Sequence, residues 1–222
     1  MQKLSEWLTL RFPSKAEGPN QNLIDEIDPD LIRRAVEEVG APDTWPLASR
    51  DHHHILKQGR SLILRTHHHR DNPWRKNYPA VNEIVARVAQ LGFGAVAGKI
   101  VIAYLPPGAV IKPHRDSGEY YKYHNRIHVP LLTNQNVTMT TDDEEFHMAT
   151  GKVYLFQNLK RHAARNASTE GRLHLILDML DTRYRPRLFR TLSPVFTTNA
   201  LWLGTAYRLS CFLAARRQHS RA

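Results

Sequence analysis

The sequence contains a single cysteine, Cys211, among its 222 residues. One thiol cannot form an intramolecular disulfide, and it excludes structural zinc sites that are built on paired thiolates. The first 30 residues also lack the continuous apolar stretch of a secretory signal, because Glu6, Arg11, Lys15 and Glu17 interrupt it. We therefore expect a reducing, cytoplasmic setting.

Acidic residues are missing from the last part of the chain. Residues 182–222 contain eight arginines and no Asp, Glu or Lys, whereas the formal charge of the whole chain is +10. This C-terminal extension could be a solvated tail, or it could meet an anionic substrate, nucleic acid or membrane lipid. Nucleic acid is the least favoured partner, because the core carries no reader motif. Residues 200–215 are too short to span a bilayer but could form a helix on its surface, so peripheral membrane contact stays open.

The length of the chain predicts one domain over residues 1–222, without internal repeats. An N-terminal part, residues 1–98, shows apolar positions at helical spacing over residues 23–39 and 81–91. Asp28-Pro29 is a helix start signal and Gly40 a stop signal for the first of these segments. We expect two supporting helices there, followed by a core over residues 99–181.

The core shows short apolar or alternating runs separated by Pro, Gly, Asn and Asp, a pattern typical of an antiparallel barrel or sandwich. The mouth of such a barrel is a natural ligand cavity. We expect about seven strands, over residues 100–104, 110–113, 126–132, 137–141, 145–148, 153–156 and 173–180, and an edge strand over 61–65.

A His-x-Asp pair lies in Pro113-His114-Arg115-Asp116. Residues two apart on an extended backbone point to the same face, so His114 and Asp116 can converge on one ion. The third ligand is expected from His162, which follows the predicted strand 153–156 at a strand-to-loop junction. Two histidines and a carboxylate form the facial triad of non-haem Fe(II), and leave three positions open for a bidentate 2-oxo acid and O2.

A lone His-x-Asp is a frequent chance match, and Arg172 adds a second feature. Arg172, His174 and Asp178 alternate with leucines and therefore share one strand face. A buried arginine needs an anion, because an isolated buried charge costs several kcal/mol. The distal carboxylate of 2-oxoglutarate would satisfy Arg172 bidentately. An ion pair within the chain, with Asp178, is the alternative.

Arg126 and His128 have the same spacing of two and alternate with Ile127 and Val129. Both are expected to face the cavity and to bind a carboxylate, either of the cosubstrate or of the substrate. For His128, packing with a backbone partner is the alternative.

These motifs, in this order, resemble the aspartyl/asparaginyl β-hydroxylase family over about eighty residues. The resemblance implies a mainly β fold, a double-stranded β-helix of the jelly-roll or cupin type with flanking α-helices, and hydroxylation with Fe(II), 2-oxoglutarate and O2. Asp116 places the chain nearer the bacterial members with a full triad, such as the proline cis-hydroxylases. The residues that carry the resemblance are 105–108, 113–116, 126–131, 151–156, His162, Asn166 and 172–178.

Two histidine runs, residues 52–54 and 67–69, stand outside these motifs. Three consecutive histidines cannot all point one way on a regular strand or helix, so neither run is expected to be a metal site. One histidine from either run is expected at the substrate entrance, with Arg65, Trp74 and residues 120–123 as lid candidates. Surface packing is the alternative for these lid candidates.

The sequence therefore predicts a dioxygenase that hydroxylates an unactivated carbon of an amino acid, an amino-acid derivative or a peptidyl residue. The substrate is expected to be a small molecule or a peptide that bears a carboxylate. Two alternatives stay open: an acyl-chain hydroxylase of a membrane lipid, anchored by the C-terminal extension, and a non-catalytic cupin-like protein that binds a metal or a ligand.

Overall fold

The computed structural model describes residues 19–46, 59–94, 97–117, 120–121, 124–142 and 144–181. Within these residues, ten strands form two antiparallel sheets, one in the order β1-β8-β5-β10-β3-β2 and the other in the order β4-β9-β6-β7. The strands are β1 Gln21–Glu26, β2 Arg60–Arg65, β3 Ala97–Leu105, β4 Val110–His114, β5 His124–Leu132, β6 Val137–Thr141, β7 Glu144–Phe146, β8 Lys152–Phe156, β9 His162–Asn166 and β10 Arg172–Leu180.

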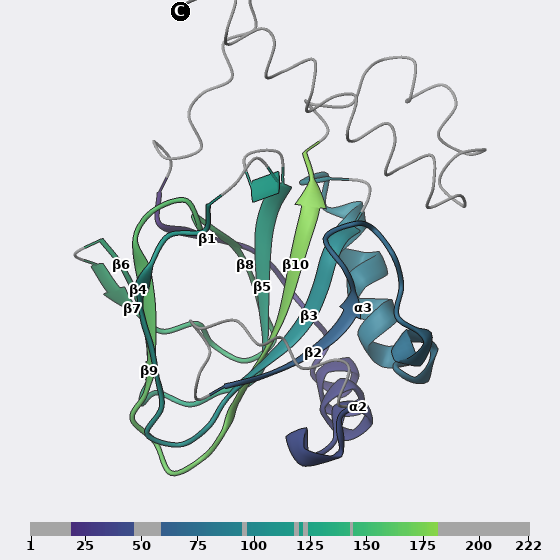
Figure 1. Ribbon diagram of the computed structural model, residues 1–222, viewed down its shortest axis with the longest axis horizontal. Helices are drawn as coiled ribbons and strands as arrows, with labels where there is room; N and C mark the ends of the chain where they lie inside the picture. Colours follow the sequence, from purple (N-terminus) through teal and green to yellow (C-terminus); the bar gives the residue numbers. More distant parts are fainter. Residues whose placement is uncertain are drawn as a thin grey trace, which may run out of the picture.

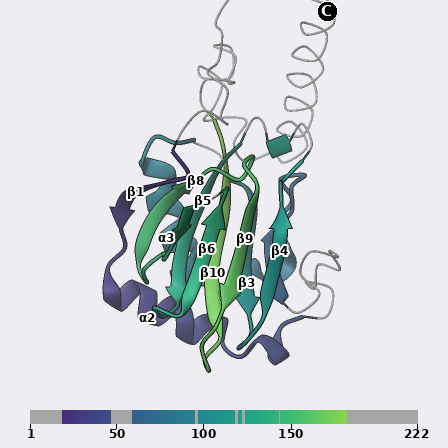
Figure 2. The same cartoon turned by 90° about the vertical axis from the view of Figure 1, so that its left-hand side faces the viewer.

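Two α-helices, α2 over Pro29–Val39 and α3 over Pro79–Gln90, cover one sheet only. Figure 1 shows both helices on the outer side of the six-stranded sheet, with the four-stranded sheet facing its other side. In Figure 2 the four-stranded sheet lies in front of the larger one. This arrangement confirms the predicted double-stranded β-helix, a jelly roll with flanking helices.

Helix α2 begins where the sequence places its start signal but not where its apolar pattern begins. The Asp28 side chain accepts hydrogen bonds from the backbone N–H groups of Asp30 and Leu31, which caps the helix. The prediction of a helix from residue 23 was wrong, because residues 21–26 form β1 and pair with β8 at the edge of the sheet. Pro29 fits only the first turn of a helix, so the helix cannot extend back through it.

Strand β10 lies in the middle of the six-stranded sheet and has two chemically different faces. Leu173, Leu175 and Leu177 pack in the main core, where the helices meet the sheet. The residues that alternate with these leucines, among them Arg172 and Asp178, point to the space between the two sheets. The alternation in the sequence thus separates a fold-stabilising face from a polar inner face.

Besides β1, strand β9 was not predicted. Residues His162–Asn166 form β9, which pairs with β4 on one side and with β6 on the other. Ala163 and Ala164 have low strand propensity, so the segment gives little local signal. The prediction of a strand-to-loop junction at His162 was therefore wrong: His162 is the first residue of a central strand.

The predicted division into residues 1–98, 99–181 and 182–222 stays a prediction, although β1 and β2 join the sheet from before residue 99. The basic extension and the first histidine run, residues 52–54, lie outside the described residues. Within the described part of the chain, no helix is long and apolar enough to cross a membrane.

Candidate functional site

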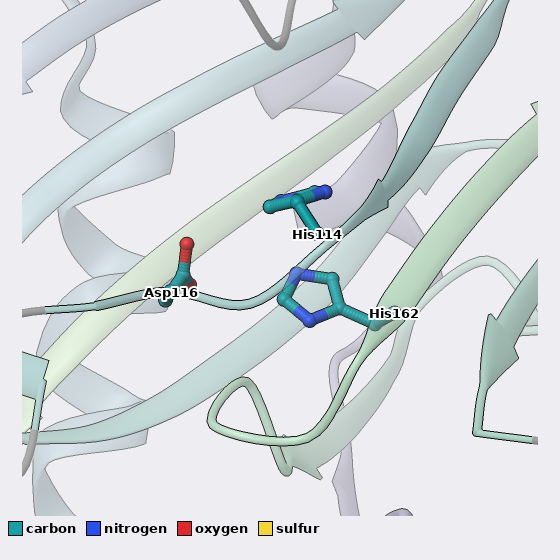
Figure 3. A group of neighbouring side chains, drawn as sticks. All are labelled: His114, Asp116 and His162. Atoms are coloured by element: carbon teal, nitrogen blue, oxygen red, sulfur yellow. The ribbon is translucent and has the colours of Figure 1, made fainter.

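The structure brings His114, Asp116 and His162 together. His114 ends β4, Asp116 follows it by two residues, and His162 lies opposite His114 in the neighbouring strand β9. The ring centroids of the two histidines are 4.2 Å apart, and one candidate ligand atom from each of the three residues lies within 4.8 Å of the others. Figure 3 shows the three side chains side by side. In the described residues, this is the one cluster of this kind.

Backbone carbonyls orient both imidazoles. Nδ1 of His114 lies 2.8 Å from the carbonyl of Lys112, and Nδ1 of His162 lies 2.9 Å from the carbonyl of Lys160. A carbonyl only accepts hydrogen bonds, so each Nδ1 carries the proton and each Nε2 keeps a lone pair for a metal. Burial lowers the pKa of His162 to about 4, which keeps this ring neutral near pH 7.

The Asp116 carboxylate is ionised and held by two donors. The Arg126 guanidinium contacts Oδ2, and the amide nitrogen of Asn158 donates to the same oxygen at 3.0 Å. Burial acts to raise the pKa of Asp116, but the charge of Arg126 and the hydrogen bond from Asn158 outweigh it and hold the pKa below its ordinary value. A neutral histidine pair and a carboxylate anion suit a divalent cation.

Arg126 faces the inside of the barrel, as predicted, but its carboxylate partners belong to the chain itself. Its Nε and Nη2 donate to the two oxygens of Asp178 at 2.8 and 3.0 Å, while Nη1 contacts Asp116. These contacts use three of the five N–H groups of the guanidinium. At most two remain for a ligand, so a ligand carboxylate at Arg126 stays a prediction.

Arg172 lies in the interior without an acidic partner. Its side chain is only 2% exposed, and among the described residues no carboxylate pairs with it. The alternative of a pair with Asp178 was wrong, because Asp178 binds Arg126. Arg172 donates to His174 at 2.6 Å and contacts the sulfur of Met139, while its Nε has no hydrogen bond. Burial lowers the pKa of Arg172 to about 9, so it is a cation at neutral pH.

His128 and His174 lie beside Arg172 as neutral rings. Because Arg172 donates to Nδ1 of His174, that nitrogen carries no proton, and the proton sits on Nε2, which is buried without a partner. Nδ1 of His128 lies 3.4 Å from the same Nδ1 of His174. Burial first, and then the charge of Arg172, lower the pKa of both histidines well below the ordinary value.

A single cavity of about 150 Å³ joins these groups. The metal-binding triad, Arg126, His128 and Arg172 all line it. Its other walls are mostly apolar, with Lys99 and Ser61 as polar exceptions. The remaining lining residues are Val101, Ala103, Ile111, Tyr121, Met139, Phe156, Ala163, Ala164 and Ile176. An apolar cavity with a few convergent polar groups is typical of a ligand site.

The second histidine run and two of the lid candidates do not line this cavity. His69 is buried, with its ring centroid 5.6 Å from that of His124. Arg65 pairs with Asp71, and the indole nitrogen of Trp74 donates to the backbone of Ile63 at 2.8 Å. Arg65 and Trp74 therefore contact residues in or beside β2, and His69 packs against the ring of His124.

Tyr121, in contrast, lines the cavity, and its ring centroid lies 5.0 Å from Cζ of Arg126. Its neighbour Tyr120 is stacked on His124 with the centroids 3.9 Å apart. Residues 122–123 of this lid candidate lie outside the described residues. Tyr121 therefore covers Arg126 at the cavity wall.

Asn158, Lys99 and the pairing of Asp178 with Arg126 were not predicted from the sequence. Asn158 gives no local signal, because its contact with Asp116 joins loops that are 42 residues apart. Asp178 did give a signal, since its alternation with Arg172 along β10 already placed it on the inner face.

Comparison with known families identifies relatives of the chain. The family model described as "Aspartyl/Asparaginyl beta-hydroxylase" matches residues 28–182, a range that includes the triad and Arg172. An L-proline cis-4-hydroxylase of Rhizobium meliloti (strain 1021) is 30% identical over 127 residues, which are 57% of this chain and 44% of that protein. The chain thus matches less than half the length of this relative.

A solved structure supports the fold. A 2OG-Fe(II) oxygenase family oxidoreductase from Burkholderia pseudomallei superposes with a TM-score of 0.51 at 11% identity, covering 72% of this chain and 83% of that one. At this identity the likeness extends to the fold alone.

Proposed function

The chain belongs to the aspartyl/asparaginyl β-hydroxylase family, and from this premise we propose that it is an Fe(II)- and 2-oxoglutarate-dependent hydroxylase of an amino acid. The observation that carries the proposal is the cavity that holds both the triad and Arg172. Arg172 is a buried cation without an acidic partner among the described residues, which is the condition that an anionic cosubstrate would relieve.

The residues fit both cofactors. His114 and His162 would hold Fe(II) through Nε2, together with a carboxylate oxygen of Asp116, and Arg172 would hold the distal carboxylate of 2-oxoglutarate. When bound, the iron and the 2-oxo acid supply an oxidant from O2 that can attack an unactivated C–H bond. The protein then has to orient that bond and exclude water. The apolar walls formed by Phe156 and Ile176 suit the second task.

The relative and the charges in the cavity support the proposed substrate class. The relative at 30% identity is an L-proline cis-4-hydroxylase, so free L-proline and similar amino acids are the first candidates. Peptidyl residues and amino-acid derivatives are the wider class. Three lining residues would meet the substrate carboxylate or the proximal carboxylate of 2-oxoglutarate. They are Lys99, His128 and Arg126, the last through its remaining N–H groups.

The test is succinate release from 2-oxoglutarate by the full chain with Fe(II) and ascorbate. The substrate panel contains free L-amino acids, their amidated and N-acylated forms, and short peptides. We expect a free amino acid to stimulate succinate release and to yield a product that is heavier by one oxygen atom in mass spectrometry. Binding of 2-oxoglutarate without turnover on any substrate would instead support a non-catalytic cupin-like protein.

A further inference from the structure

The Asp116 carboxylate is held at one oxygen only. Both side-chain donors, Nη1 of Arg126 and Nδ2 of Asn158, contact Oδ2. The backbones of Asp116 and Asn158 are also joined, because the N–H of Asp116 donates to the carbonyl of Asn158 at 3.2 Å. The orientation of the carboxylate is thus fixed from two sides, and neither side-chain donor occupies Oδ1.

Arg126 is in turn fixed by Asp178. The two residues lie directly opposite each other on β5 and β10, so the ion pair is a cross-strand pair. It is bidentate, and the Asp178 side chain is only 1% exposed. The chain of contacts therefore runs from a buried carboxylate in the middle of the large sheet, through Arg126, to the metal-binding triad.

This arrangement matters for how many positions a metal would have free. A carboxylate that binds through one oxygen leaves three of six positions open, whereas binding through both oxygens would remove one of them. A bidentate cosubstrate and O2 need all three. The charge of Arg126 next to Asp116 also opposes cation binding, and Asp178 balances that charge.

We propose that Asp178 is a positioning residue of the metal site, which acts through Arg126. Asp178 fixes the guanidinium, and the guanidinium together with Asn158 holds Oδ2 of Asp116 so that Oδ1 is available to the metal. This inference rests on the metal site of the proposed function. It assigns to Asp178 a role in metal binding although it contacts none of the three triad residues directly.

The test is titration of the metal-free full chain with Co(II), without cosubstrate, followed by visible absorption. We expect Asp178→Asn to weaken Co(II) binding about 10- to 100-fold, as is typical for residues that orient metal ligands. The matched control is Asp25→Asn, which breaks another bidentate Asp–Arg pair, Asp25 with Arg87, outside the cavity. The control should leave Co(II) affinity unchanged.

A double-mutant cycle separates positioning from simple charge or from unfolding. If Asp178 acts through Arg126, Asp178→Asn should cause less than about a twofold further loss in an Arg126→Met background. A loss of full size in that background would overturn the proposal, because it would mean that Asp178 acts independently of Arg126. Unchanged Co(II) affinity of Asp178→Asn would overturn it as well.

Asp178→Glu keeps the charge of the pair and moves the carboxylate by one methylene, which serves if Asp178→Asn does not fold. Weaker Co(II) binding by this variant supports positioning, and wild-type binding contradicts it. Failure of the wild-type chain to bind Co(II) would remove the proposed metal site itself. The two ideas therefore fail at different steps of the experiment.

Discussion

Nη2 of Arg172 lies 2.6 Å from Nδ1 of His174, its neighbour on the inner face of β10. The hydrogen-bond partner of this buried cation is thus a neutral ring. Among the described residues, its other side-chain hydrogen bond is to the sulfur of Met139. A cation in such a place destabilises the ligand-free protein, since its desolvation is not compensated by an opposite charge. An anionic ligand would compensate the desolvation of Arg172 and so stabilise the protein.

Replacement of Arg172 by methionine should therefore separate stability from binding. We expect Arg172→Met to leave the ligand-free protein as stable as the wild type or more stable, by up to about 3 kcal/mol, because an unpaired buried charge is removed. The same variant should bind 2-oxoglutarate at least about 100-fold more weakly, since charge-assisted bidentate hydrogen bonds are lost. Urea unfolding and calorimetric titration measure the two quantities.

Arg165→Met is the control for this prediction, because Arg165 lies exposed on β9. It should change neither quantity appreciably. A structural arginine would give the opposite pattern, in which Arg172→Met lowers the free energy of unfolding by several kcal/mol while 2-oxoglutarate affinity is retained. That pattern would remove Arg172 from the cosubstrate site.

Much of the site could be read from the sequence because strand periodicity determines which side chains share a face. The members of three pairs differ by two or six positions along the chain and lie on the inner side: His114 with Asp116, Arg126 with His128, and Arg172 with Asp178. The partners could not be derived in this way. Which carboxylate meets Arg126 depends on the register between β5 and β10, and a bulge shifts that register near Leu173.

Local sequence patterns likewise predicted only some of the strands. Residues 137–141 and 173–180 carry strong strand patterns, and both are strands in the structure. Strand β9 was missed because its alanines give no local signal, and its position between β4 and β6 supplies the stabilisation. Residues 23–26, which lie in β1, were assigned to a helix because short apolar patterns before a helix start are ambiguous.

Metal binding to the triad should stabilise the protein measurably. Addition of Mn(II) or Co(II) at about 100 times its Kd should raise the free energy of unfolding by about 2.7 kcal/mol, and a chelator should reverse this. His162→Ala should abolish the effect, because it removes one of three ligands. His68→Ala, an exposed histidine in a run that resembles a metal site, is the control. Loss of the shift in both variants would indicate unspecific binding.

The metal-free protein should lose stability as the pH falls below about 6.5. Burial lowers the pKa of His69 and of His162 to about 4, whereas in the unfolded chain a histidine has its ordinary pKa near 6.5. Between these values the unfolded state binds more protons, so the free energy of unfolding decreases with decreasing pH. Each such histidine contributes about 1.4 kcal/mol per pH unit at most.

Urea unfolding in the presence of a chelator at pH 7.5, 6.5 and 5.5 measures this slope. The window lies above the range in which Asp116 takes up a proton, because the pKa of that carboxyl is lowered. His128 and His174 add to the same trend, since burial lowers their pKa as well. Constant stability from pH 7.5 to 5.5 would show that these rings are not neutral and buried in the folded state.

Gly98 lies against Tyr120, the neighbour of the cavity-lining Tyr121. A methyl group at this position should lower the stability of the fold and disturb the cavity wall. A Cβ at Gly98 would meet the hydroxyl of Tyr120, and would lie 2.9 Å from the ring of His124 and 3.0 Å from the backbone oxygen of Asp178. Tyr120 also accepts a hydrogen bond of 2.7 Å from the N–H of Lys99, so it cannot move away without losing that bond. We expect Gly98→Ala to cost about 1–3 kcal/mol through overpacking.

Gly108→Ala is the informative comparison, because Gly108 has a φ of +71° and open space around its Cβ position. Its cost of about 1–2 kcal/mol would come from backbone strain alone. Only Gly98→Ala should also impair substrate-stimulated succinate release, since the Tyr120 that it displaces is followed directly by Tyr121, which covers Arg126 in the cavity. Equal effects of both variants on turnover would mean that Tyr120 and Tyr121 do not shape the site.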